Sequence, residues 1–159
     1  MAALTPAFLD TSVLVAGLIE IGGPSEYPQR IMTAIAGGQV RRAVTAWHCC
    51  LEFYSVTTRL PEEFRLAPEE ALRLVEEEVI GRLEVRQLSD RDREGFLRAL
   101  EQERVIGGRV YDAHIAEVAR VSGARVIVTD NRRHFLSLGR HGIRVLGAEE
   151  FVKAAGLGR

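Results

Sequence analysis

Short apolar runs in this chain are separated from one another by longer segments of helical periodicity, and this alternation restricts the possible folds more than any other feature. Five runs are predicted to be strands: Ala7 to Leu9, Arg42 to Thr45, Leu83 to Leu88, Val126 to Val128 and Ile143 to Leu146. The run at 126–128 is apolar and β-branched throughout, which is typical of a strand buried on both faces. Because a helix separates each strand from the next, the strands are expected to run parallel. The sequence therefore predicts an α/β fold, a three-layer α/β/α sandwich with a central parallel sheet of four to five strands.

Helices are predicted in the intervals between these strands. The first follows Asp10, where Val13, Leu14 and Leu18 share one face, and it ends at a break over residues 21–25. Further helices are predicted over residues 27–35, 47–60, 68–80, 89–100, 111–121 and 149–155. Pro68 suits a first helical position, and Ser89 with Asp92 resembles a capping box.

Length and composition indicate one globular domain, covering residues 1–159. A chain of 159 residues buries roughly 70% of the surface that its unfolded form exposes. The formal net charge is −1, so any site for a polyanion must be a local basic patch. Cys49 and Cys50 are adjacent, which makes a structural disulfide between them unfavourable. The two thiols are therefore expected to be reduced. No apolar run is long enough to span a membrane, and no basic stretch precedes the first apolar run. These features together predict a cytoplasmic protein.

Four acidic residues carry the chemistry that the sequence suggests. Asp10 and Asp130 each follow a predicted strand, whereas Glu52 and Asp112 lie within otherwise apolar helical segments. Ligands of open α/β sheets bind at the carboxyl ends of the strands. Four carboxylates gathered there would repel one another unless cations neutralised them, and an all-oxygen ligand set suits Mg²⁺ or Mn²⁺. One or two such ions, about 4 Å apart when paired, would support hydrolysis of a phosphodiester.

Each of these acids also has a purely structural interpretation. Asp10, Asp112 and Asp130 could cap the N-termini of helices. Glu52 could extend to solvent from a half-buried helix. The sequence alone leaves these alternatives open for any single acid, and the joint pattern favours the metal site.

Four motifs in order resemble the PIN-domain family, and within it the VapC-type toxins of bacterial toxin–antitoxin pairs. The segment from Phe8 to Leu14 resembles the first acidic motif of that family, and Leu51 to Pro61 resembles the second. Tyr111 to Ala116 resembles the third motif, and Gly123 to Phe135 resembles the fourth. The motifs span residues 7–135, which is most of the chain.

The resemblance implies a metal-dependent endoribonuclease in which Asp10 and Asp112 chiefly hold the ion. Glu52 and the fourth acidic position would complete the catalytic and metal-binding set. The fourth motif departs from the family pattern, because Asp130 stands one residue early and Asn131 occupies the usual place. A histidine, His134, precedes the phenylalanine where an acid is common. Asn131 is therefore expected to share the role of Asp130.

The remaining predicted site residues support the acids or contact the substrate. Ser12 and Thr129 are expected to orient the carboxylates through their hydroxyls, with turn or helix capping as the alternative. Basic residues cluster between residues 125 and 144, where Arg132 and Arg133 are expected to contact RNA phosphates. A merely solvated face is the alternative for that cluster.

The resemblance further implies two protein partners, a second copy of the chain and an antitoxin. VapC-like proteins pair through helices, and the antitoxin covers the active-site cleft. The apolar faces of residues 47–60 and of the first two helices are the candidate surfaces in this chain.

Three other readings compete with an active nuclease. An inactive PIN-like scaffold that only binds RNA is disfavoured because all four acidic positions carry a carboxylate, counting Asp130. A haloacid-dehalogenase-type phosphohydrolase needs a second aspartate two residues after Asp10, where Ser12 stands. Nucleotide binding of the Rossmann type needs a glycine-rich loop after the first strand, and Asp10-Thr11-Ser12 occupies that place.

Overall fold

The computed structural model describes residues 2–22 and 25–158 of the chain. Its β-strands are β1 (Ala7–Leu9), β2 (Ala43–Ala46), β3 (Glu84–Arg86), β4 (Val126–Val128) and β5 (Arg144–Leu146). Its α-helices are α1 (Thr11–Leu18), α2 (Glu26–Ala36), α3 (Trp47–Thr57), α4 (Pro68–Leu74), α5 (Asp90–Gln102), α6 (Arg109–Val121) and α7 (Ala148–Ala154). A π-helical segment, η2 (Val75–Ile80), continues α4, and short 3₁₀ segments are η1 (Ala2–Leu4), η3 (Arg132–His134) and η4 (Leu136–His141).

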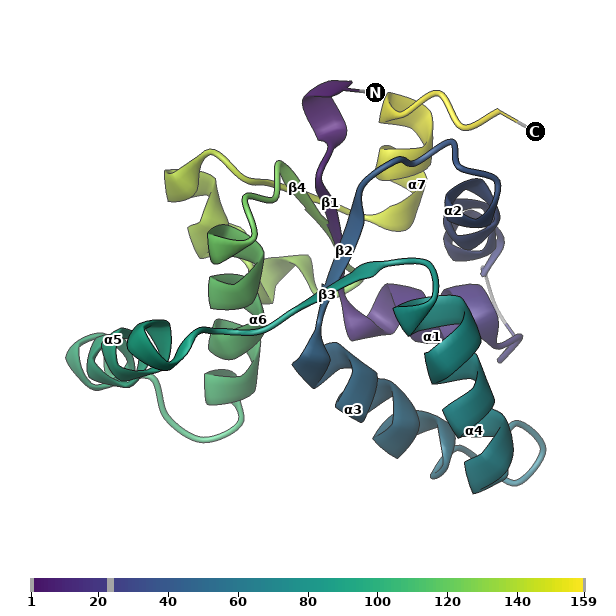
Figure 1. Ribbon diagram of the computed structural model, residues 1–159, viewed down its shortest axis with the longest axis horizontal. Helices are drawn as coiled ribbons and strands as arrows, with labels where there is room; N and C mark the ends of the chain where they lie inside the picture. Colours follow the sequence, from purple (N-terminus) through teal and green to yellow (C-terminus); the bar gives the residue numbers. More distant parts are fainter. Residues whose placement is uncertain (1, 23–24, 159) are drawn as a thin grey trace.

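The five strands form one parallel sheet in the order β3-β2-β1-β4-β5. Helices α1, α2 and α7 lie on one side of the sheet and α5 and α6 on the other (Figure 1). The predicted three-layer α/β/α fold with a parallel sheet is thus confirmed. Helix α3 begins directly at the carboxyl end of β2 and extends away below the sheet in the view of Figure 1.

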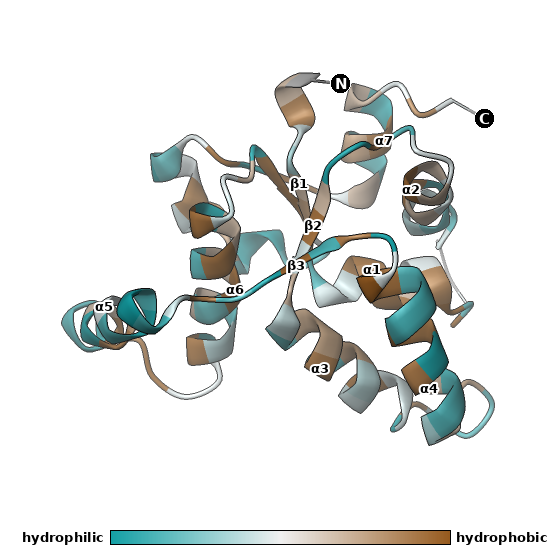
Figure 2. Cartoon of the chain, viewed as in Figure 1, coloured by the Kyte–Doolittle hydropathy of each residue, from teal (hydrophilic) through white to brown (hydrophobic). Residues whose placement is uncertain are grey.

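The central strands are apolar because helices cover both of their faces. Every residue of β1 and β4 is fully buried, as expected for the middle of a parallel sheet. The edge strand β3 has an exposed, half-buried, exposed pattern, and its hydrophilic colouring contrasts with that of β1 and β4 in Figure 2. Charged residues on an edge strand discourage pairing with another sheet.

Most predicted elements lie within a few residues of their observed bounds, with two instructive differences. Helix α3 was expected to reach residue 60 but ends at Thr57. The N–H of Arg59 bonds to the carbonyl of Val56, so the final turn tightens before Pro61, whose ring disfavours helix in the residue before it. The helix expected over 68–80 changes to π-type hydrogen bonding after Leu74, and the N–H of Gly81 bonds to Glu76 O. Gly23 and Pro24, in the predicted break after the first helix, lie outside the described residues.

Two further features bear on the predictions from composition. Cys49 and Cys50 are buried free thiols. Burial raises the pKa of Cys49 to about 12 and that of Cys50 to about 11. Within the described ranges, no helix combines the length and apolar character needed to cross a membrane.

Candidate metal centre

The candidate site lies where the strand order reverses. β1 pairs with β2 on one side and with β4 on the other, and Leu9 is in register with Val128. Asp10 follows β1 directly, and its N–H bonds to the carbonyl of Val128 at 3.1 Å. Crevices of this kind, outside the carboxyl ends of parallel strands at a reversal point, are the usual ligand sites of open α/β sheets.

Four carboxylates line one cavity of about 340 Å³ at this edge. They come from four separate parts of the chain: Asp10 after β1, Glu52 in α3, Asp112 in α6 and Asp130 after β4. The cavity is also lined by Thr11, Ser12, Asn131 and the apolar side chains of Val15, Ala16, Ile21, Val56 and Ile115. The acids that the sequence singled out are therefore brought to one place, although Asp10 and Asp130 are 120 residues apart in the sequence.

Asp10 is the most buried of these acids, with 4% of its surface exposed. Its Oδ2 accepts hydrogen bonds from the hydroxyls of Thr129 at 2.7 Å and Ser12 at 3.2 Å. Burial raises the pKa of the Asp10 carboxyl above its usual value, and the nearby Glu52 raises it further. The two hydroxyl donors and a backbone contact with Thr11 oppose this rise in pKa. Asp10 occupies the N-cap position of helix α1, but its side chain makes no capping hydrogen bond to that helix.

The same two hydroxyls tie the fourth motif to Asp10. The N–H of Asp130 donates to Ser12 Oγ at 3.1 Å, and the N–H of Asn131 donates to Thr129 Oγ1 at 3.0 Å. Each hydroxyl therefore accepts from the loop after β4 and donates to the carboxylate after β1. The position of Asp130 and Asn131 relative to Asp10 is set by this hydrogen-bond relay.

Glu52 and Asp112 each have a polar neighbour of their own. Thr11 Oγ1 donates to Glu52 Oε1 at 3.1 Å, and His48 Nε2 lies 3.5 Å from the same oxygen. His134 Nδ1 lies 3.0 Å from Asp112 Oδ2. Asp112 is inside the first turn of α6, whose N-cap residue is Gly108, and so it does not cap that helix.

The donor set fits a hydrated Mg²⁺ or Mn²⁺ better than an ion enclosed by protein. The lining acids and the amide carbonyl of Asn131 offer hard oxygen ligands. Across the described part of the chain, no three His, Cys, Asp or Glu side chains are placed to hold one ion together. Mg²⁺ commonly keeps several waters and takes only one or two carboxylates, with substrate phosphates completing its shell.

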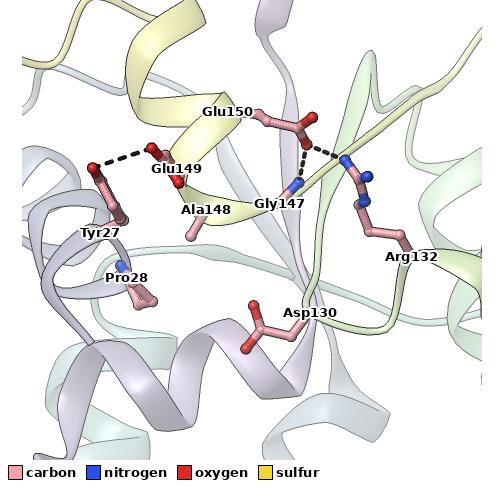
Figure 3. A pocket seen from close by; sticks show the side chains of 8 residues that line it. All are labelled: Tyr27, Pro28, Asp130, Arg132, Gly147, Ala148, Glu149 and Glu150. Carbon is pink, nitrogen blue, oxygen red and sulfur yellow. Dashed lines mark hydrogen bonds and ion pairs between the residues drawn. The ribbon is translucent and has the colours of Figure 1, made fainter. Parts of the chain in front are cut away.

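Asp130 also borders a second cavity, of about 440 Å³, between α2 and the start of α7. Figure 3 shows Asp130 across this cavity from Glu149 and Glu150. Arg132, predicted to contact RNA, forms an ion pair here with Glu150, which also accepts from the N–H of Gly147 at 2.9 Å. The charge of Arg132 is thus partly balanced within the chain, although Arg132 is exposed like its neighbour Arg133.

Sequence reasoning missed three side chains that contact the candidate acids. Thr11 stands between two predicted site residues, but nothing local reveals that its hydroxyl reaches Glu52, 41 positions away. The i, i+4 spacing of His48 and Glu52 on one helix was a usable signal. His134 was noted only as a departure from the family motif, and its contact with Asp112 depends on how η3 lies against α6.

The chain is similar to several known proteins. A family model described as PIN domain matches residues 6–133. Ribonuclease VapC27 of Mycobacterium tuberculosis is 37% identical over 131 residues, which cover 80% of this chain and 86% of that protein. Among solved structures, DNA-bound VapBC from Salmonella typhimurium matches with a TM-score of 0.58 and 24% identity, over 89% of this chain and 97% of the other. VapBC-1 from nontypeable Haemophilus influenzae matches with a TM-score of 0.56 and 17% identity, over 90% and 98%.

Proposed function

This chain belongs to the PIN-domain family, and we propose that it is a metal-dependent endoribonuclease that acts as the toxin of a toxin–antitoxin pair. One observation carries the catalytic part of the proposal: four carboxylates from four segments line a single cavity at the point where the strand order reverses. Its relative VapC27 is a ribonuclease by name, which supports RNA as the substrate.

Asp10 and Asp112 are proposed as the principal ligands of Mg²⁺ or Mn²⁺, with Glu52 and Asp130 completing the set for one or two ions. Asn131 would share the position of Asp130, since both border the same cavity. When bound, the metal would supply Lewis-acid stabilisation of charge on the phosphate and a water of lowered pKa. The proposed role of the carboxylates is to hold the ion and to accept the proton released by the attacking water.

The surrounding residues would keep those carboxylates in position. Thr129 and Ser12 donate to the same oxygen of Asp10, which supports a fixed orientation of that carboxylate. Thr11 does the same for Glu52. Hydrogen-bonded supports of this kind commonly matter to metal affinity almost as much as the ligands do.

RNA would approach this edge through local basic residues, because the net charge of the chain is −1. Arg133 is exposed and is proposed to contact a phosphate. For Arg132 a phosphate contact would require competition with Glu150. We therefore expect Arg133 to contribute more to RNA affinity than Arg132.

The partners proposed are a second copy of this chain and an antitoxin. Helix α3 presents Leu51 and Tyr54 with 54% and 40% of their surfaces exposed, which favours pairing through this helix. An antitoxin is supported by the VapBC assemblies among the similar structures. It would inhibit by covering the carboxylate cavity.

The direct test is cleavage of RNA by the purified chain with Mg²⁺, with Mn²⁺ and with excess EDTA. Cleavage should require the metal and should be lost in Asp10→Asn, which keeps the shape of the side chain and removes its charge. A DNA strand of the same sequence should be cut poorly, because it lacks the 2′-hydroxyl. RNA that is bound but left intact with either metal would favour the inactive scaffold, and cleavage undiminished by EDTA would exclude the metal mechanism.

The homodimer is tested separately by light scattering of the wild type and of Tyr54→Arg. The wild type should have the mass of a dimer, and the arginine should shift it towards the monomer. A wild-type monomer at high concentration would exclude pairing through α3.

A further inference from the structure

Another cavity, of about 210 Å³, lies beside the carboxylate site. It is lined by Trp47, His48 and Leu51 of α3, Arg86 of β3 with Gln87 and Leu88, Arg93 of α5, and His114 and Val118 of α6. Its volume is below the roughly 300–1,000 Å³ of pockets that enclose drug-sized ligands. A single planar ring system is therefore a better match than a whole nucleotide.

The charge of this cavity is opposite to that of the carboxylate site. Two guanidinium groups, Arg86 and Arg93, and two imidazoles, His48 and His114, line it, and its described lining includes no Asp or Glu. Arg93 has an acidic partner in Asp90 at 2.9 Å, outside the lining. In a chain with a formal charge of −1, this is a local basic patch of the kind that a polyanion requires.

Aromatic rings are arranged around the same cavity. Trp47 keeps 45% of its surface exposed at the rim. His114 meets His48 edge-on with ring centroids 5.2 Å apart, and His48 also stacks on Tyr111, which is outside the lining, at 5.5 Å. Exposed aromatic rings beside cations are the combination that binds single-stranded nucleic acid, because every base offers a face for stacking.

The cavity lies at the same edge of the sheet as the carboxylates. Trp47 and His48 begin α3 at the carboxyl end of β2, and Gln87 follows the carboxyl end of β3. The carboxylate cavity is at the same edge of the sheet, next to β1 and β4. His48 joins the two sites, since its Nε2 lies 3.5 Å from Glu52 Oε1. The two strand spacings from β1 to β3 amount to about 10 Å, within reach of a nucleotide adjoining the one at the carboxylates.

We propose that this cavity binds a base of the RNA strand, stacked on Trp47, with Arg86 and Arg93 contacting the adjoining phosphates. The inference rests on the proposed ribonuclease function and adds a specificity-determining site to it. A protein segment is the less favoured occupant, because the lining joins two guanidinium groups and two imidazoles with no carboxylate.

The test measures binding of a short fluorescein-labelled single-stranded RNA by anisotropy, in an Asp10→Asn background that leaves the RNA intact. Affinity is measured over a range of salt concentrations. Trp47→Ala should weaken binding about 5- to 160-fold without changing the slope of affinity against salt. Arg93→Gln should reduce that slope by about 0.7, the value for one phosphate contact on a single strand.

Helix α5 supplies matched controls for both variants. Arg98 is exposed and paired with an acid as Arg93 is, but it does not line the cavity. Leu97 is an exposed apolar residue of the same helix, also outside the lining. Arg98→Gln and Leu97→Ala should each leave affinity and slope unchanged. Trp47→Phe, which keeps a stacking ring, should retain most of the affinity and so distinguishes stacking from a folding defect.

The inference is overturned if Trp47→Ala binds RNA as tightly as its parent, or if Arg93 and Arg98 variants have the same slope. A Trp47→Ala protein with unchanged RNA affinity but a lower mass in solution would assign the cavity to a second copy of the chain. If the Asp10→Asn parent binds no RNA and the wild type cleaves none, the proposed function itself fails. The two failures are thus distinguishable.

Discussion

Replacement of Thr129 by valine is the sharpest test of how the candidate site is held together. The change keeps the β-branched shape of a fully buried side chain and removes the hydroxyl that donates to Asp10 Oδ2 at 2.7 Å. A hydrogen bond to a charged group contributes about 1.5–3 kcal/mol, against about 0.5–1.5 kcal/mol for a neutral one. The lost acceptor for the N–H of Asn131 costs less, because Asn131 is exposed to water. We therefore expect Thr129→Val to lower the free energy of unfolding by about 2 kcal/mol at neutral pH.

Thr45 offers a matched control inside the same sheet. It is equally buried, and its hydroxyl donates to the uncharged carbonyl of Leu9 at 2.8 Å. Thr45→Val should cost about 1 kcal/mol. In an Asp10→Asn background the cost of Thr129→Val should fall to the same range, because the acceptor is then neutral.

Urea unfolding in EDTA measures all of these free energies, and RNA cleavage is followed in parallel. Thr129→Val should lower cleavage about tenfold, in line with the outer-shell supports of other metal sites. Equal costs for the two threonine variants, unchanged by Asp10→Asn, would refute the idea that Thr129 acts through the charge of Asp10.

Three further predictions follow from the geometry. Asp10→Asn and Asp112→Asn should each lower the rate of RNA cleavage by ~10²-fold or more, which is about 3 kcal/mol of barrier. Asp130→Asn should lower it less, because Asn131 can share the role of Asp130. Equal losses in all three variants would contradict this ranking. Burial raises the pKa of Asp10 above its usual value of 3.8. The stability that this group contributes is therefore present below pH 3.8 and is lost as the pH rises through the raised pKa. Melting curves should show that Asp10→Asn gains stability relative to the metal-free wild type between acid and neutral pH. Because burial raises the thiol pKa of Cys49 to about 12 and of Cys50 to about 11, neither should react with a thiol reagent in the native protein at pH 8, and rapid native labelling of either would contradict the described burial.

Much of the fold could be predicted because the signals are local. Strands β1 and β4 are continuous apolar runs, and helices such as α6 have apolar residues at helical spacing. Ser89 was predicted to cap α5, and its Oγ does accept from the N–H of Asp92. The end of α3 was placed three residues too late, because the tightening of a last turn depends on hydrogen bonds that periodicity does not reveal.

The sequence by itself determined that the sheet is parallel. It also determined which two acids follow apolar strands and which two lie within apolar helices. Those properties depend on residue types and spacings within one element, so a single chain reports them. That these four acids bind a metal stays a prediction.

Only the tertiary structure decided how the acids are held. Thr129 and Asp10 are 119 residues apart in the chain, and they meet because β4 pairs with β1 instead of adding to the outer edge of the sheet. The same pairing buries Asp10, and the packing of α7 brings Glu150 into an ion pair with Arg132. Strand order is set by how the helices cover the two faces of the sheet, which is a property of the whole core and not of any segment.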